Sequence, residues 1–176
     1  DTYFQGRESA NPYYLEVPGI VQLAMDEFAA LTGRGYDLVE YYGDPEADRV
    51  VVIMGSGAQT VRSTVEYLCA HGQKVGVVQL RMYRPFPTEQ VLAAIPASAR
   101  VVAVMDRTKE PGAGGEPLFL DIASAIGEAH AAGRRPAMPL LVGGRYGLSS
   151  KEFTPAMVVG VYDELALPAP RPRFTV

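Results

Sequence analysis

Cysteine and histidine are scarce in this sequence of 176 residues. Cys69 is the one cysteine, and His71 and His130 are the two histidines. A single cysteine excludes an internal disulfide framework, and these three residues do not make a Cys/His metal cluster. An iron–sulfur cluster is held by several thiolates, so this chain by itself is expected to bind none.

Long apolar runs and blocks of positive charge are also missing. No stretch approaches the roughly 18 consecutive apolar residues of a membrane-spanning helix, so no membrane segment is predicted. The formal net charge is −4 and no run of basic residues exceeds two, which argues against nucleic acid as a partner. No basic stretch followed by an apolar one opens the sequence, so no secretion signal is predicted and we expect a cytoplasmic protein.

What is present is the composition of an ordinary globular chain, with 48% apolar and 20% charged residues. Its length suffices to bury the core of about one domain. We divide it into a lead-in segment with one helix over 1–48, an α/β domain over 49–167, and a Pro-rich exit linker over 168–176. The polar start without methionine and the alternating prolines near the end predict a piece cut from a longer polypeptide, with a further domain after the linker.

Between residues 49 and 167, short apolar strands alternate with helical patterns. Strands are predicted over 50–54, 74–80, 100–105 and 140–142, and helices over 58–71, 88–94, 117–130 and 155–165. Continuous apolar strands that alternate with helices are typical of a mostly parallel sheet covered on both faces. The sequence therefore predicts a three-layer α/β/α fold, in which the loops after the strands carry function.

The two ends of the chain are less regular. Residues 1–16 show little periodicity and are expected to be extended. A helix is predicted over 18–32, with Pro18 in its first turn and Gly33 as its C-terminal cap. The final residues 173–176 resemble the start of a strand.

Gly55-Ser56-Gly57 follows a predicted strand and opens a predicted helix. A turn of this kind can bind phosphate, because free N–H groups at a helix N-terminus attract anions. The third glycine of a dinucleotide motif is absent, since position 60 is Thr60, and no acidic residue ends the next strand. We interpret the glycines as close packing of strand on helix. A free-standing, flavodoxin-like nucleotide-binding module is the alternative.

Charged residues gather in the loops that follow the strands. The carboxyl ends of parallel strands meet at one edge of a sheet, so these side chains are expected at the same edge. They would either clamp a phosphate or carboxylate group, or form internal and interdomain ion pairs, and we favour the pairs. The candidates for facing a cleft or another domain are Arg81, Arg84, Arg107, Lys109, Glu110, Glu116 and Arg145.

No set of residues in the sequence completes a catalytic apparatus. Asp106 and Glu110 are candidate acid–base carboxylates, but no nucleophile or histidine lies near them in the sequence. His71 and His130 fall at predicted helix C-termini, where positive partial charge is favoured. Cys69 lies on the apolar side of a helix and is expected to pack there. We therefore assign no catalytic, cofactor-binding or metal-binding residue.

The same loops contain long and unusual motifs. They are Val52-Ile53-Met54-Gly55-Ser56, Tyr83-Arg84-Pro85-Phe86-Pro87, Asp106-Arg107-Thr108-Lys109-Glu110-Pro111-Gly112, Gly115-Glu116-Pro117-Leu118, Gly143-Gly144-Arg145-Tyr146-Gly147-Leu148 and Ser150-Lys151-Glu152-Phe153-Thr154-Pro155. Near the start, Phe4-Gln5-Gly6-Arg7-Glu8 and Asn11-Pro12-Tyr13-Tyr14 belong with them. Together these motifs closely resemble the pyruvate:ferredoxin (flavodoxin) oxidoreductase family over essentially the whole chain.

The resemblance implies the second domain of the large chain of such an enzyme, with a lead-in from the first, and a fold similar to the C-terminal domain of transketolase. Family members decarboxylate pyruvate oxidatively, with coenzyme A, to acetyl-CoA and CO2. They use thiamine diphosphate with Mg and pass electrons along 4Fe-4S clusters to ferredoxin or flavodoxin. The resemblance places all these cofactors in other domains, so it carries no catalytic residue to this chain, and the chain alone is expected to be inactive.

The implied partners are the other domains of the same chain, ferredoxin or flavodoxin, and a second copy in a homodimer. Related 2-oxoacid oxidoreductases share the architecture, so another 2-oxoacid is an alternative substrate. A further alternative is a regulatory domain of another thiamine enzyme, such as a transketolase or a dehydrogenase beta subunit. The Tyr-Arg-Pro-Phe motif and the Lys-Glu-Pro-Gly loop at 109–112 resemble the pyruvate branch.

Overall fold

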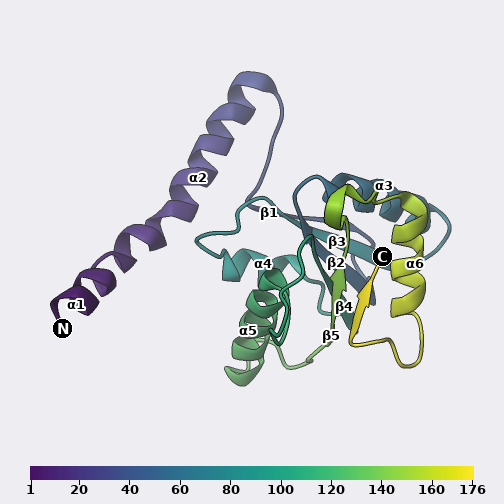
Figure 1. The fold of residues 1–176 in the computed structure, drawn as a ribbon. Coiled ribbons are helices and arrows are strands. Elements are labelled where there is room, and N and C mark those ends of the chain that lie inside the picture. The colour runs from purple at the N-terminus through teal and green to yellow at the C-terminus, as the bar shows by residue number, and fades with distance from the viewer.

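A computed structural model describes residues 1–176, and one sheet runs through it in the strand order β1-β3-β2-β4-β5-β6 (Figure 1). The strands are β1 (Val39–Gly43), β2 (Arg49–Met54), β3 (Val75–Leu80), β4 (Val101–Asp106), β5 (Leu140–Arg145) and β6 (Arg173–Thr175). β1 runs antiparallel to β3, whereas all the other neighbouring strands are parallel. The predicted mostly parallel sheet is confirmed.

Helices cover both faces of this sheet. They are α3 (Gly57–Ala70) and α6 (Pro155–Leu165) on one face, and α4 (Thr88–Ala94) and α5 (Pro117–Ala131) on the other. Successive side chains of a strand point to opposite faces, so Val51 and Ile53 of β2 pack under α3 and α6, while Val50 and Val52 pack under α4 and α5. The three-layer α/β/α prediction is confirmed.

Two helices begin at a threonine, but only one of these threonines caps its helix through the side chain. Pro155 opens α6, and the Thr154 hydroxyl accepts a hydrogen bond from the backbone N–H of Met157 at 3.4 Å. Thr88, however, is the first residue of α4 and makes no capping bond, because Pro87 occupies the capping position. Thr88 therefore marks where α4 begins but does not cap the helix.

The first 32 residues, which we call the arm, contain the helix predicted over 18–32, but the segment before it differs from the prediction. The expected extended segment 1–16 is helical: α1 (Thr2–Glu8) is followed by α2 (Asn11–Thr32), and Pro18 lies inside α2. The first turns of α2, residues 11–17, are mostly apolar, so this part of the sequence has little of the polar–apolar periodicity by which a helix is recognised. The lead-in thus has two helices and β1, and the arm projects from the α/β domain (Figure 1).

The start of a strand predicted at 173–176 is confirmed as β6, and the sheet extends beyond the four strands predicted between residues 49 and 167. β5 continues through Arg145, and β6, which lies within the expected exit linker, pairs with it in parallel. Phe174 of β6 is 6% exposed and packs into the core. The burial of this ring explains why the chain joins the sheet here, so the extended linker stops before residue 173.

Candidate functional site

The carboxyl ends of β2 and β4 border a cavity of about 430 Å³, which we call the edge hollow. β3 lies on one side of β2 and β4 on the other, so this is the switch point at which open α/β sheets bind ligands. A cavity of about 480 Å³ lies at the opposite, amino edge, where this fold class does not place its sites. The edge hollow is lined by Met54, Gly55, Ser56, Tyr83, Asp106, Arg107, Thr108, Glu110, Pro117 and Tyr146.

The glycine turn at the start of α3 is packed against an aromatic ring. A Cβ atom added at Gly57 would lie 2.7 Å from Cε2 of Tyr146. The Tyr146 hydroxyl donates to the Met54 carbonyl at 3.2 Å, and its ring lies 4.5 Å from that of Phe153. Burial raises the pKa of Tyr146. Glycine at position 57 therefore lets β5 approach α3 closely, which supports the packing interpretation.

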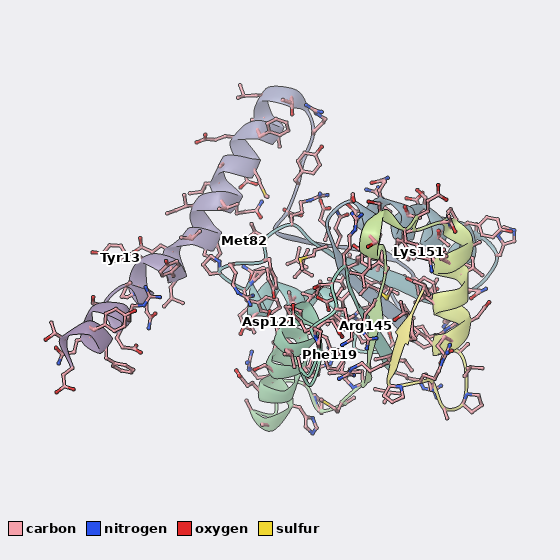
Figure 2. The ribbon with its side chains drawn as sticks, in the orientation of Figure 1. Tyr13, Met82, Phe119, Asp121, Arg145 and Lys151 are labelled. Atoms are coloured by element: carbon pink, nitrogen blue, oxygen red, sulfur yellow. The ribbon has the colours of Figure 1, made fainter.

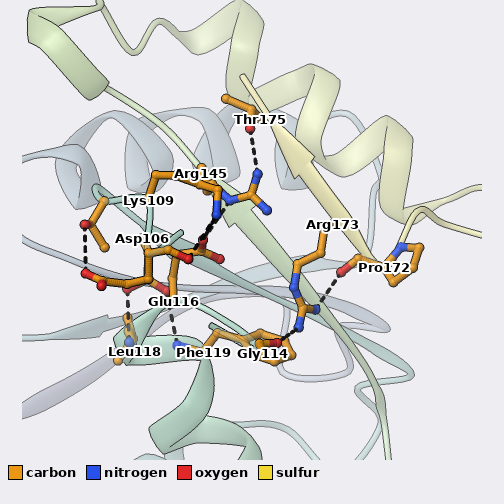
Figure 3. Close-up of polar contacts among 12 residues, drawn as sticks. Asp106, Lys109, Gly114, Glu116, Leu118, Phe119, Arg145, Pro172, Arg173 and Thr175 are labelled. Carbon is orange, nitrogen blue, oxygen red and sulfur yellow. Dashed lines mark hydrogen bonds and ion pairs between the residues drawn. The ribbon is translucent and has the colours of Figure 1, made fainter. Parts of the chain in front are cut away.

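Asp106 ends β4 and holds the start of α5. It is 2% exposed, and its two carboxylate oxygens accept the backbone N–H groups of Leu118 at 3.0 Å and Phe119 at 3.1 Å (Figure 3). Burial raises its pKa, although these hydrogen bonds oppose the effect. The carboxylate is fully used as a helix cap, which assigns this candidate acid–base residue a structural role.

Glu116 pairs with two of the positively charged side chains that were predicted at this edge. Its side chain is 3% exposed and lies 2.9 Å from Nε of Arg145 and 3.7 Å from Nζ of Lys109. Nη1 of Arg145 also donates to the Thr175 hydroxyl of β6 at 3.3 Å (Figure 3). Burial alone would raise the pKa of Glu116, but the hydrogen bond and charge of Arg145 outweigh it and lower the pKa. This cluster fastens the loop after β4 to the last two strands.

The Glu116→Gln variant is expected to lose about 2 kcal/mol of unfolding free energy at pH 7, because a charge-assisted hydrogen bond is removed. The pKa of Glu116 is lower in the folded chain than its ordinary value of 4.5. The carboxylate therefore stabilises the fold above that value, and this contribution is lost as the pH falls through the folded pKa. Urea unfolding at several pH values should show a constant difference above about pH 5 that narrows in acid. A difference that persists unchanged in acid would contradict the ion pair.

Two other arginines that were predicted at this edge lie apart from Glu116 and its partners. Arg81 pairs with Glu40 of β1 and stacks 4.7 Å from the ring centre of Tyr36. Arg84 pairs with Asp121 of α5 at 2.8 Å. These arginines thus tie loops to the domain's own strands and helices.

Arg107 and Glu110 are the two candidates that remain without an ion-pair partner in the chain. Both are exposed and line the edge hollow. Nε of Arg107 donates to the Gly147 carbonyl at 3.0 Å, and Glu110 accepts from the Thr108 hydroxyl at 3.5 Å. Their charges are therefore available to groups outside the chain.

One contributor to this edge was missed in the sequence. Arg173 of β6 donates to the carbonyls of Pro172 and Gly114, and its guanidinium lies 4.1 Å from the ring centre of Phe119 (Figure 3). It holds the loop after β4 from the far side. The sequence carried no signal for this contact, because it depends on β6 joining the sheet.

The two histidines lie at the C-terminal ends of α3 and α5, and Cys69 lies at the margin of the core. Nδ1 of His71 lies 2.7 Å from the Tyr67 carbonyl, Nδ1 of His130 lies 2.9 Å from the Arg135 carbonyl, and Sγ of Cys69 lies 3.4 Å from the Val75 carbonyl. No three His, Cys, Asp or Glu side chains converge as metal ligands. A single cysteine does not fit an iron–sulfur cluster, which is held by several thiolates.

No helix of the structure has the length and apolar character needed to cross a membrane.

Comparisons with known proteins agree on one family. Residues 47–146 match the model of the pyruvate:ferredoxin oxidoreductase core domain II. The whole chain is 56% identical to the pyruvate-flavodoxin oxidoreductases of Trichormus variabilis and Rhodospirillum rubrum, and 51% identical to the pyruvate:ferredoxin oxidoreductase of Moorella thermoacetica. All of this chain is covered in each match, and it spans 14–15% of the length of these relatives.

Proposed function

Because the chain belongs to the pyruvate:ferredoxin oxidoreductase family, as its core domain II, we propose that it is a non-catalytic domain that connects other domains of such an enzyme. The proposed whole enzyme oxidatively decarboxylates pyruvate with coenzyme A to acetyl-CoA, CO2 and reduced ferredoxin or flavodoxin. Thiamine diphosphate, magnesium, iron–sulfur clusters and coenzyme A are bound by its other domains. In this proposal the enzyme is a cytoplasmic homodimer, and residues 49–167 form the domain proper.

The observation that carries the proposal is the internal use of the charged edge. Five of the seven candidate residues form ion pairs within the chain, and Asp106 caps α5. These contacts hold the loops against the domain's own strands and helices. Arg107 and Glu110 are left to face outward. An edge held in this way, with two unpaired charges, is suited to docking another domain.

Charge reversal at Arg107 tests this role in the full-length oxidoreductase. Arg107→Glu is expected to reduce the amount of correctly assembled enzyme about tenfold, because one reversed docking charge costs at least about 1.4 kcal/mol. The matched control is Lys74→Glu, since Lys74 is also exposed and unpaired but precedes β3 at the amino edge. Size-exclusion chromatography measures assembly. Equal assembly of the two variants would count against docking through this edge.

The edge hollow favours a second candidate function, that of a nucleotide-binding module. It borders the N-terminus of α3 and contains Arg107, so a nucleotide or flavin phosphate is the ligand that would suit it. Calorimetry of the chain with adenine nucleotides, flavin and coenzyme A distinguishes the two functions. Micromolar binding would favour the nucleotide-binding module over the connecting domain.

A further inference from the structure

The arm carries the entire net charge of the chain. Residues 1–32 contain five acidic residues and one basic residue, Arg7, which gives a net charge of −4. Residues 33–176 contain fifteen of each sign and are neutral. The arm and the α/β domain therefore differ in electrostatic character as well as in shape.

One face of α2 is apolar and uncovered. Tyr13, Ile20, Ala24 and Leu31 are spaced at i, i+7, i+11 and i+18, so they form one stripe along the helix. Tyr13 is 75%, Ile20 59% and Leu31 86% exposed, and Ala24 is also exposed. We call these four residues the apolar stripe, and Figure 2 shows Tyr13 on the part of the arm that projects from the domain.

Two residues of α2 fix the arm to the domain: Gln22, opposite the apolar stripe, and Phe28, beside its C-terminal part. The Gln22 side chain donates to the Tyr36 carbonyl at 3.3 Å and to Asp37 Oδ1 at 3.2 Å, and accepts from the Leu38 N–H at 3.3 Å. The rings of Phe28 and Tyr36 stack with their centres 6.0 Å apart. The arm is therefore attached near its C-terminal end, and the N-terminal part of the apolar stripe lies away from these contacts.

We propose that the apolar stripe docks onto another domain of the same polypeptide, on an apolar surface bordered by lysine and arginine. A row of large apolar side chains this exposed on one face of a helix marks a surface that another part of the protein covers. Glu16 and Glu27 flank the stripe, so a basic border matches its charge. A second arm is a poor partner, because two surfaces of charge −4 repel each other.

The length of the relatives supports another domain of the same polypeptide as the partner of the arm. The core domain II match begins at residue 47 and leaves the whole arm outside it. The chain spans 14–15% of its relatives, whose remaining length supplies other domains for the arm to contact. The inference rests on the proposed connecting function, and it adds a second contact surface, far along the chain from the carboxyl edge.

Tryptic cleavage after Arg34, just beyond α2, reports on docking in the full-length oxidoreductase. Ile20→Asp places a charge in the stripe and is expected to speed cleavage about tenfold, because cleavage follows the population of the undocked state. Leu15→Asp is the matched control, since Leu15 is 79% exposed but lies on the other side of the helix. Its cleavage should stay within about twofold of the unsubstituted enzyme. Equal cleavage of all three proteins would overturn the proposal.

Two further measurements test the charge and the occupant. Glu27→Gln, which adds no tryptic site, should also speed cleavage after Arg34, and slower cleavage would contradict the basic border. Sedimentation of the 176-residue chain should show a monomer, and a dimer that Ile20→Asp dissociates would make a second copy the occupant. Unchanged unfolding of the Ile20→Asp chain establishes that the variant folds. If Arg107→Glu impairs assembly but Ile20→Asp leaves cleavage unchanged, the connecting function stands and the arm inference fails.

Discussion

The Tyr162→Ala variant is expected to lose about 4 kcal/mol of the free energy of unfolding, because a fully buried aromatic ring is replaced by a methyl group and a cavity. Tyr162 of α6 is 0% exposed, and its hydroxyl donates to the Gly76 carbonyl of β3 at 2.8 Å. Burial raises its pKa well above the ordinary value, so the hydroxyl remains neutral and able to donate. The ring and hydroxyl together join α6 to the sheet.

Urea unfolding followed by far-ultraviolet circular dichroism measures this loss. The total stability of a domain is about 5–15 kcal/mol, so the variant forfeits a large share of it. Tyr162→Phe is the control, because it keeps the ring and removes only the hydrogen bond, at a cost of about 1 kcal/mol. Equal, small losses in both variants would mean that the ring is not a main element of this core.

Asp106→Ala is the second large effect, with an expected loss of about 3 kcal/mol. The substitution leaves the N–H groups of Leu118 and Phe119 without their carboxylate acceptor in a buried setting. Asp106→Asn retains one acceptor oxygen and should lie between the two. Hydrogen exchange should show the loss first in the opening turn of α5. Normal protection of that turn in Asp106→Ala would contradict the capping role.

The α/β core could be predicted because its local patterns agree with its packing. Residues 50–53 are β-branched and buried on both faces, and they form the centre of β2 as expected. Pro155 after Thr154 marks the start of α6. In such segments the residues that favour the local structure also fill the core, so periodicity and capping are sufficient signals.

The helix over 18–32 and a strand beginning at residue 173 were predicted, whereas the helical first 17 residues and the place of β6 in the sheet were not. The N-terminal half of α2 lacks a polar face, and Pro18 suggests a helix start although the helix continues through it. β6 is three residues long and depends on pairing with β5 and on burial of Phe174. The place of β6 in the sheet is thus determined by contacts that are distant in the sequence.

The sequence predicted where the charged side chains lie, but it did not predict which of them form ion pairs with each other. Five cations were expected at the ends of the strands, and four of them have acidic partners there. The partner of Arg81 lies on β1 and that of Arg84 on α5, so only the fold brings each pair together. Sequence spacing therefore could not separate Arg107, which is unpaired, from the others.

Turnover per assembled enzyme tests the central claim most directly. Full-length Arg107→Glu oxidoreductase should be separated by size, and its assembled fraction assayed for pyruvate oxidation with coenzyme A and an electron acceptor. If the domain only connects its neighbours, kcat and the KM for pyruvate in this fraction should match those of the unsubstituted enzyme within about twofold. Normal assembly with kcat lowered about 100-fold would instead place this edge in the chemistry.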